Sequence, residues 1–249
     1  MAEDADSDPS LYAQGLTRRF GDKTVVDEIA IVVPRGSVTG LLGPNGAGKT
    51  TAMRMMAGIL RPTRGETLII SYDIWREPLK AKAALGYLPE SLDLYDNLTT
   101  EEFLRFICRA YGMDDGITDE ALERWMAIFG LEDLADELIG DQSKGFRQRV
   151  ALASVFIHDP EVLILDEPFI NLDPATSRMV KDLLMDGRDE RAVLLATHLA
   201  SVAEEVCDHV IVLNKGKVIA RDQPAPLAKR FGGDLERAFV ELVKEETPA

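Results

Sequence analysis

One nine-residue segment, residues 43–51 with the sequence Gly-Pro-Asn-Gly-Ala-Gly-Lys-Thr-Thr, constrains the fold of this chain more than any other part of it. It matches the pattern G-x-x-x-x-G-K-[S/T] and follows an apolar run, residues 38–42, that predicts a buried strand. Residues 50–60 then read as a helix. Glycines let backbone N–H groups converge on an anion, and the positive end of the following helix points the same way. The segment therefore predicts a site for the phosphates of a nucleotide.

Within this loop the long side chain of Lys49 can reach the β- and γ-phosphates, and the hydroxyl of Thr50 can bind Mg²⁺. The alternative is a glycine-rich turn that matches by chance, with odds on the order of one in a hundred for a chain of this size. The flanking strand and helix favour the functional interpretation. The predicted nucleotide-binding residues of the loop are Gly43, Pro44, Asn45, Gly46, Ala47, Gly48, Lys49, Thr50 and Thr51.

A pair of carboxylates follows a second apolar run, residues 162–165. Asp166 suits a contact with Mg²⁺, direct or through water, because this cation prefers oxygen ligands. Glu167 points to the other side of the strand end and suits polarisation of an attacking water. Taken alone, the pair fits a solvated strand end equally well, but its combination with the glycine-rich loop favours a catalytic role.

The order of predicted elements indicates an α/β fold. Residues 11–38 alternate in short pieces that predict an antiparallel β subdomain, and strands alternate with helices again after Pro160, which predicts a mostly parallel sheet. Between these parts lies a mostly helical insertion, with a helix start at Thr99 and helices expected over residues 119–129, 131–139 and 147–156. Ligands of such folds bind at the carboxyl ends of the parallel strands.

Composition narrows the function classes. The chain has 249 residues with 28 Lys and Arg against 43 Asp and Glu, and this net charge of −15 argues against nonspecific nucleic-acid binding. The two cysteines, Cys108 and Cys207, lie far apart, which argues against a disulfide scaffold or a zinc ribbon. No apolar run is long enough to span a bilayer. Residues 1–10 are acidic and read as a disordered tail.

Across residues 11–243 this order of motifs resembles the nucleotide-binding subunits of ABC transporters. Asn171-Leu172-Asp173-Pro174, after the carboxylate pair, looks like the D-loop of that family. His198 follows a predicted strand at the position of the family's switch histidine, where it would contact the γ-phosphate. The resemblance implies a P-loop ATPase core formed by residues 11–88 and 158–249, with residues 89–157 as its helical subdomain, all within a single domain over residues 11–249.

Three further sites are implied by the resemblance. Phe20 fits the aromatic residue that stacks on adenine, with a core aromatic as the alternative. Residues 142–149, Gln-Ser-Lys-Gly-Phe-Arg-Gln-Arg, occupy the signature position, usually Leu-Ser-Gly-Gly-Gln, and keep only Ser143 and Gly145. These two would contact the ATP held by a partner subunit. Glu90 stands where most of the family has a glutamine that touches Mg²⁺ or the attacking water.

The resemblance implies an ATPase that uses ATP and Mg²⁺ and pairs with a second copy of itself or with a paralogous subunit. Softer similarities around Tyr87-Leu88-Pro89-Glu90 point to exporters whose membrane permease is a separate chain. Such a subunit would be cytoplasmic, held at the inner face of the membrane by the permease, with no nucleic acid as partner. The alternatives are a soluble ABC-type ATPase of translation or DNA maintenance, and a binding module without catalysis.

Overall fold

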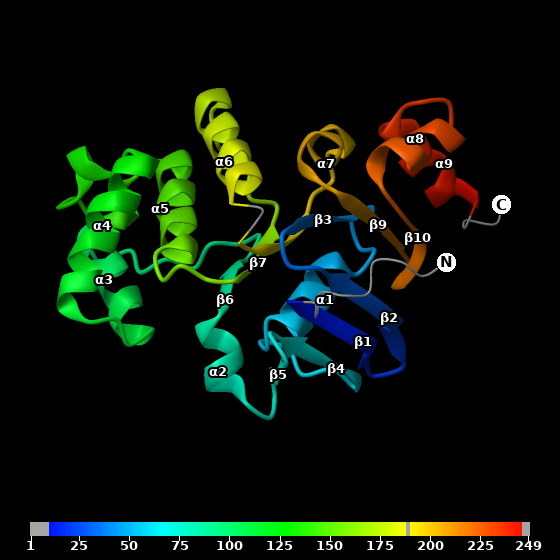
Figure 1. Cartoon of the computed structure of the whole chain (residues 1–249), viewed down its shortest axis with the longest axis horizontal. Coiled ribbons are helices and arrows are strands. Elements are labelled where there is room, and N and C mark those ends of the chain that lie inside the picture. Colours follow the sequence, from blue (N-terminus) through cyan, green and yellow to red (C-terminus); the bar gives the residue numbers. More distant parts are fainter. Residues whose placement is uncertain (1–9, 188–189, 246–249) are drawn as a thin grey trace.

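The structure is a computed structural model that describes residues 10–187 and 190–245. It consists of two β-sheets and a group of helices that extends to one side (Figure 1). Within the described residues no helix is both long and apolar enough to cross a bilayer. The predicted acidic tail, residues 1–10, lies outside the described residues except for Ser10. That residue is buried, and its backbone oxygen accepts a hydrogen bond of 2.9 Å from the Ile70 N–H.

The smaller sheet is antiparallel throughout, which confirms the predicted N-terminal β subdomain. Its strand order is β2-β1-β4-β5. The strands are β1 (Leu11–Phe20), β2 (Lys23–Val33), β4 (Arg64–Ile69) and β5 (Tyr72–Asp73). Strand β4 ends at Ile69, because Ile70 and Ser71 have positive φ angles of 46° and 66° and turn the chain into β5.

The larger sheet has the order β10-β9-β3-β8-β7-β6 and is parallel except for the edge strand β10. This confirms the α/β fold with a mostly parallel sheet. Its strands are β3 (Ser37–Leu42), β6 (Leu85–Leu88), β7 (Val162–Asp166), β8 (Ala192–Ala196), β9 (His209–Asn214) and β10 (Lys217–Asp222). Both faces are covered, which explains the continuous apolar runs: along β7, Leu163 and Leu165 pack on one core while Val162 and Ile164 pack on the other.

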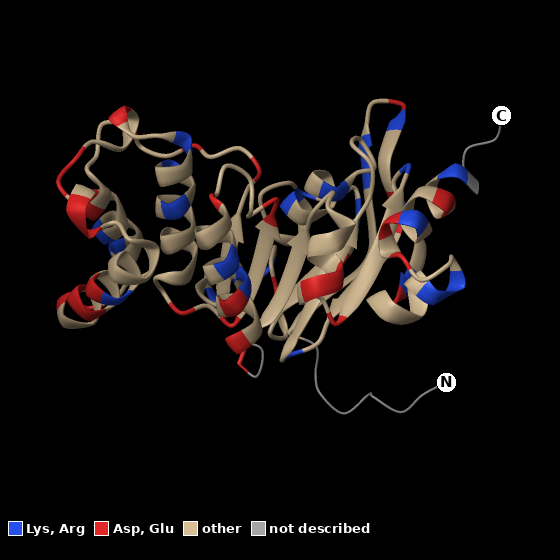
Figure 2. Cartoon of the chain, turned by 90° about the horizontal axis from the view of Figure 1, so that it is seen from above, with Lys and Arg blue, Asp and Glu red and all other residues tan. Residues whose placement is uncertain are grey.

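Helix α1 (Lys49–Met56) packs between the two sheets, where Met53, Met55 and Met56 are fully buried (Figure 1). It ends earlier than the predicted residue 60, since Gly58 adopts a left-handed φ of 66°. The opposite face of the large sheet is covered by α6 (Pro174–Asp186), α7 (Ala200–Val206), α8 (Pro224–Arg230) and α9 (Leu235–Glu245). Charged residues lie mainly on helices and loops, while the central strands carry almost none (Figure 2).

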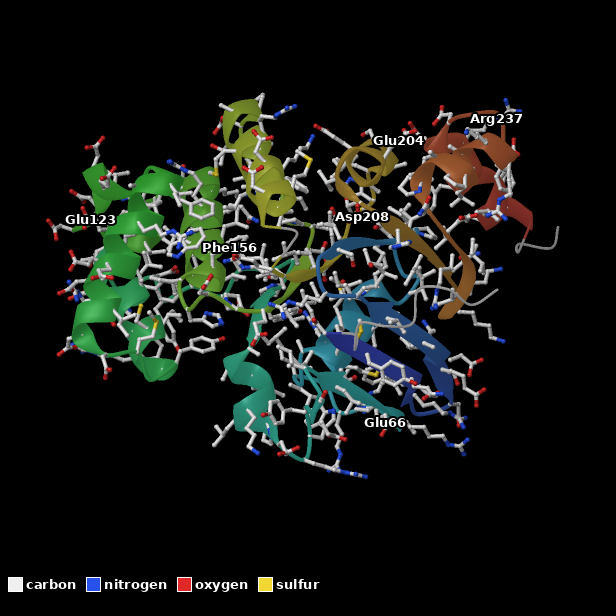
Figure 3. The ribbon with its side chains drawn as sticks, viewed as in Figure 1. Glu66, Glu123, Phe156, Glu204, Asp208 and Arg237 are labelled. Atoms are coloured by element: carbon white, nitrogen blue, oxygen red, sulfur yellow. The ribbon has the colours of Figure 1, made fainter. Side chains whose placement is uncertain are left out.

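The remaining large helices, α3 (Thr100–Ala110), α4 (Asp115–Phe129) and α5 (Lys144–Phe156), lie within the predicted helical insertion. Thr99 and Glu102 form a capping box at the start of α3, as the sequence predicts. Aromatic side chains of α4 and α5 pack together in the core of this insertion. Trp125 stacks on Phe156, with ring centroids 5.2 Å apart, and Phe129 lies beside both. Figure 3 labels Phe156, which lies at the end of α5.

The prediction of a helix at residues 131–139 is wrong. The segment contains only two short 3₁₀ turns, η1 (Glu132–Leu134) and η2 (Ile139–Asp141). Its backbone pairs instead with the entry to α3, where Leu138 forms a β-bridge with Thr99 and the Ile139 N–H donates to the Leu98 oxygen at 3.0 Å. Backbone groups used in this pairing are not free to form the i→i−4 bonds of an α-helix.

A further strand, β6, and a short helix, α2 (Pro78–Ala83), precede Glu90 and were not expected from the sequence. Strand β6 extends the large sheet by pairing with β7 in parallel, so that Leu88 lies beside Leu165. Because Asp166 follows Leu165 directly, the end of β6 delivers residues 89–90 close to the carboxylate pair.

Candidate active site

A cavity of about 330 Å³ lies where β3 and β7 end and α1 begins. The glycine-rich loop and the carboxylate pair are far apart in the sequence, but β8 lies between β3 and β7 and brings the ends of both strands to one edge of the sheet. The residues that line the cavity are Val25, Asn45, Gly46, Ala47, Gly48, Lys49, Thr50, Thr51, Glu90, Asp166 and Glu167.

Two glycines of the loop are required by close backbone packing. A Cβ atom on Gly43 would lie 2.4 Å from the backbone oxygen of Leu213, and one on Gly48 would lie 2.9 Å from that of Val25. Gly48 also has a φ of 106°, which side chains of L-residues rarely tolerate. The loop is therefore held between β9 and β2, with its backbone facing the cavity. Val25 was missed by sequence reasoning, because nothing in an apolar strand residue signals which loop it will face.

Lys49 is buried and crosses the loop. Its Nζ donates hydrogen bonds to the backbone oxygens of Gly43, at 2.6 Å, and Pro44, at 3.4 Å. Burial lowers the pKa of this ammonium group, while the carboxylates of Glu167, Asp166 and Glu90 act in the opposite direction. Gly43 and Pro44 do not line the cavity themselves, but they hold the lysine that does.

Asp166 is 1% exposed, and within the described part of the chain neither of its carboxylate oxygens has a hydrogen-bond partner. Burial raises the pKa of this carboxyl to about 6; the Thr50 hydroxyl opposes the rise, although it makes no hydrogen bond of standard geometry with either oxygen. A buried carboxylate without partners is costly. A cation beside it would remove that cost, so these residues fit a bound divalent metal.

The metal would not be enclosed by protein ligands alone. Among residues 10–187 and 190–245, no cluster of three or more His, Cys, Asp or Glu side chains has the spacing of a complete metal site. Mg²⁺ characteristically binds through one or two carboxylates together with substrate phosphates and water. The cavity offers Asp166 and the Thr50 hydroxyl, with Glu90 at its exposed edge.

Glu167 and His198 meet at the same edge. The Nδ1 atom of His198 lies 2.8 Å from Oε1 of Glu167, and the histidine side chain is 53% exposed. Glu167 is itself 9% exposed, and its backbone has a φ of 52°, which is unusual for a residue with a side chain. Its N–H donates to the Ala196 oxygen at 3.0 Å, so β8 holds the backbone of the turn.

Phe20 does not line the cavity. It lies 48% exposed at the end of β1, and the Arg18 guanidinium covers its ring at 4.5 Å from the centroid. The hairpin that carries Phe20 continues into β2, which brings Val25 against Gly48. The aromatic ring is therefore attached to a strand that borders the loop.

Ser143 and Gly145 lie outside the cavity as well. Ser143 is exposed and caps α5, since its hydroxyl accepts a hydrogen bond from the Phe146 N–H at 3.2 Å. A Cβ atom on Gly145 would lie 2.8 Å from the Asn171 oxygen, so the signature segment packs closely on the predicted D-loop of the same chain.

Residues 26–170 match the protein family described as ABC transporter. The chain is 37% identical to the probable multidrug ABC transporter ATP-binding protein YbhF of Escherichia coli over 243 residues, which cover 94% of this chain and 42% of that protein. It is 34% identical to Nod factor export ATP-binding protein I of Ralstonia nicotianae over 248 residues, or 98% of this chain and 75% of the relative. This chain thus spans less than half the length of YbhF.

Two solved structures have the same fold. One is described as the ATP-binding subunit of an ABC transporter; it is 31% identical with a TM-score of 0.88, over 93% of this chain and 98% of the other. The second is described as cbiO1 from Clostridium perfringens, part of the ABC transporter complex cbiONQ; it is 26% identical with a TM-score of 0.76, over 97% of both chains. The chain belongs to the ABC transporter family, as one of its ATP-binding proteins.

Proposed function

We propose that this chain is the ATP-hydrolysing subunit of a transporter whose membrane permease is a separate chain, and that the transporter exports its substrate. The observation that carries the proposal is the cavity in which Lys49 faces Asp166 and Glu167. A phosphate cradle supplies ATP binding, and two carboxylates of different burial supply a metal contact and a base. The direction of transport rests on the sequence similarity to exporters alone.

The residues divide into three roles at this site. The backbone of residues 43–51 and the Lys49 ammonium group bind the phosphates, and Phe20 stacks on the base. Thr50, Asp166 and Glu90 hold Mg²⁺, which, when bound, neutralises phosphate charge and orients the γ-phosphate. Glu167 orients a water for attack and accepts its proton, while His198 holds Glu167 and approaches the γ-phosphate.

The site is completed by a second copy of the chain or by a paralogous subunit. Ser143 and Gly145 belong to the signature segment, and neither reaches the cavity of its own chain. Ser143 is exposed at the N-terminus of the 13-residue helix α5, whose free N–H groups and dipole favour a phosphate. Two chains placed head to tail would bring this helix end to the partner's ATP. Closing and opening of that sandwich would drive the permease.

The permease would hold the chain at the cytoplasmic face of the membrane. The described residues contain no membrane-spanning helix, so the transport path would belong to the other chain. The chain's acidic composition favours this role over that of an ATPase acting on ribosomes or DNA.

The proposal is tested with the chain expressed alone and together with a candidate membrane permease. We expect Mg²⁺-dependent ATP hydrolysis that Lys49→Ala abolishes, and we expect the chain to sediment with membranes only when that permease is present. Hydrolysis that is unaffected by Lys49→Ala would overturn the assigned site. Sedimentation with ribosomes in place of membranes would favour the translation alternative.

A further inference from the structure

Gln148 lies on α5, five residues after the exposed Ser143, and is 4% exposed. Its side-chain Nε2 donates a hydrogen bond of 3.1 Å to the backbone oxygen of Pro168. Of the two polar atoms of the amide, only the nitrogen can donate to a carbonyl, which fixes the orientation of the side chain. The buried amide therefore joins the signature helix to the residue that directly follows Glu167.

This point of the chain needs support. Glu167 has the left-handed φ of 52°, a conformation that persists only where neighbouring contacts fix it. On its N-terminal side, the Glu167 N–H is held by the Ala196 oxygen. On the other side stands Pro168, which has no N–H to donate, so its carbonyl is the backbone group through which another element can hold it. Gln148 makes that contact.

We propose that Gln148 is a positioning residue for Glu167. By holding the Pro168 carbonyl, it fixes the turn that aims the Glu167 carboxylate toward His198 and the cavity. The inference rests on the proposed function, in which Glu167 activates the attacking water. Within one subunit, α5 thus presents Ser143 to the partner's nucleotide and supports the catalytic carboxylate of its own site.

Arg149 offers a matched control on the same helix. Its Nη1 donates to the backbone oxygens of Phe129, at 2.8 Å, and Gly130, at 2.9 Å, and so ties α5 to the end of α4 rather than to the catalytic turn. Gln148→Met and Arg149→Met each remove a hydrogen bond that a side chain of α5 donates to a buried or half-buried carbonyl. Both variants keep an unbranched side chain at the substituted position. Only the first should affect catalysis specifically.

The experiment compares these two variants with the wild-type chain in three measurements: kcat for ATP hydrolysis, ATP affinity, and the ATP-dependent dimer seen by size exclusion. For Gln148→Met we expect kcat to fall at least about tenfold, with the ATP dissociation constant within about threefold and the ATP-bound dimer accumulating. For Arg149→Met we expect a lower melting temperature with kcat within about threefold.

Three outcomes would overturn the inference. Equal loss of kcat in both variants would make Gln148 a packing residue of α5. Loss of the ATP-bound dimer in Gln148→Met would mean that it acts through the signature contact with the partner. A Gln148→Met protein with wild-type kcat would show that the hydrogen bond is not needed.

Two further variants keep these results interpretable. Gln148→Asn retains an amide, but its side chain is one methylene too short to reach Pro168. If Gln148→Met fails to bind ATP, Gln148→Asn takes its place in all three measurements. Glu167→Gln separates the two hypotheses. Turnover in that variant would refute the proposed function, whereas an inactive Glu167→Gln beside an active Gln148→Met would refute the positioning role alone.

Discussion

The His198 imidazole lies 2.8 Å from the carboxylate of Glu167, so two side chains that are 31 residues apart in the sequence form one unit at the edge of the cavity. An ionised carboxylate can only accept, so Nδ1 of His198 is the donor in this contact and Nε2 is left for another one. The pair thus fixes the orientation of both groups. This contact supports the proposed roles, in which Glu167 activates the attacking water and His198 holds Glu167.

Glu167→Gln should abolish steady-state turnover and retain ATP binding. The amide preserves the shape of the side chain but cannot accept the proton of the attacking water, while Lys49 and the loop backbone still hold the phosphates. We expect a loss of at least about 100-fold in kcat and accumulation of an ATP-bound dimer on size exclusion. Turnover close to that of the wild-type chain would show that another group activates the water.

The glycine-rich loop is predicted to be most sensitive at Gly43. An added Cβ would lie 2.4 Å from the Leu213 oxygen, a backbone atom of β9 that cannot move aside cheaply. We expect Gly43→Ala to lower the free energy of unfolding by about 3 kcal/mol and to weaken ATP binding, because the Gly43 oxygen also holds Lys49.

Gly46→Ala is the matched control for stability. A Cβ atom there meets nothing within 4 Å, and only its φ of 80° opposes the substitution. The expected loss is about 1 kcal/mol. Chemical denaturation of both variants would measure the difference, and equal losses would mean that the contact with Leu213 is not what requires a glycine at residue 43.

The glycine-rich loop and the carboxylate pair can be recognised in the sequence because each is a local pattern that directly follows a buried strand, and the structure places both at one cavity. The structure of residues 131–139 was not predictable in this way. Apolar spacing suggests a helix there, but pairing of Leu138 and Ile139 with the entry to α3 takes the backbone donors away. That competition depends on a partner segment some forty residues earlier.

The same limit applies to the side chains around the site. Val25 borders the cavity and Gln148 holds the Pro168 carbonyl beside Glu167, yet neither residue type signals such a position. Each acts through a backbone atom that the fold places beside it. Single-sequence patterns identify groups that perform chemistry, whereas the residues that position those groups become visible only when the neighbouring elements are known.

Because His158 is partly buried, we expect the folded state to lose stability as the pH falls. It stacks on Tyr111 with ring centroids 3.6 Å apart, and its Nε2 lies 3.2 Å from the Leu85 oxygen. Burial lowers its pKa from 6.5 to about 4, while the contact with Leu85 acts in the opposite direction. At pH values between about 4 and 6.5, His158 binds a proton in the unfolded chain but not in the folded chain.

The stability due to His158 is therefore fully present above pH 6.5 and is lost as the pH falls toward 4. Its upper limit is about 3 kcal/mol. Urea unfolding at several pH values measures the free energy of unfolding. Over this range it should change less with pH in His158→Gln than in the wild-type chain. Parallel slopes for the two proteins would place the acid sensitivity elsewhere.

Activity should rise more than linearly with protein concentration at low concentration. In the proposed dimer, each site lacks the signature contact until a second subunit supplies Ser143 and Gly145, so a monomer would be incomplete. A dilution series of the isolated chain measures this effect. Mixing Lys49→Ala with Ser143→Arg should restore part of the activity, because one of the two sites in a mixed dimer joins the intact Lys49 of one chain with the intact Ser143 of the other. Constant specific activity down to concentrations at which the chain is monomeric would exclude a shared site.

Glu90 departs from the family pattern, because most of the family has a glutamine at this position. It is exposed, but it lines the same cavity as Asp166 and Lys49. Its negative charge adds to the rise in the pKa of Asp166 and opposes the lowering of the pKa of Lys49 by burial. In one interpretation its carboxylate replaces an amide oxygen as a ligand of Mg²⁺, which accepts either. In the other, Glu90 points to solvent and the substitution is neutral.

Glu90→Gln separates these interpretations. A carboxylate near the γ-phosphate is unfavourable unless the metal is present, so a metal-binding Glu90 predicts a steeper requirement for Mg²⁺ in the wild-type chain than in the variant. Basal ATPase activity of the variant should stay within about tenfold, since exchanging one metal contact for a weaker oxygen costs about 1.4 kcal/mol or less in the barrier. Transport should suffer more than hydrolysis, because the resemblance places this loop against the permease. Titration of Mg²⁺ against activity for both proteins measures the effect, and superimposable curves would leave Glu90 without a role at the metal.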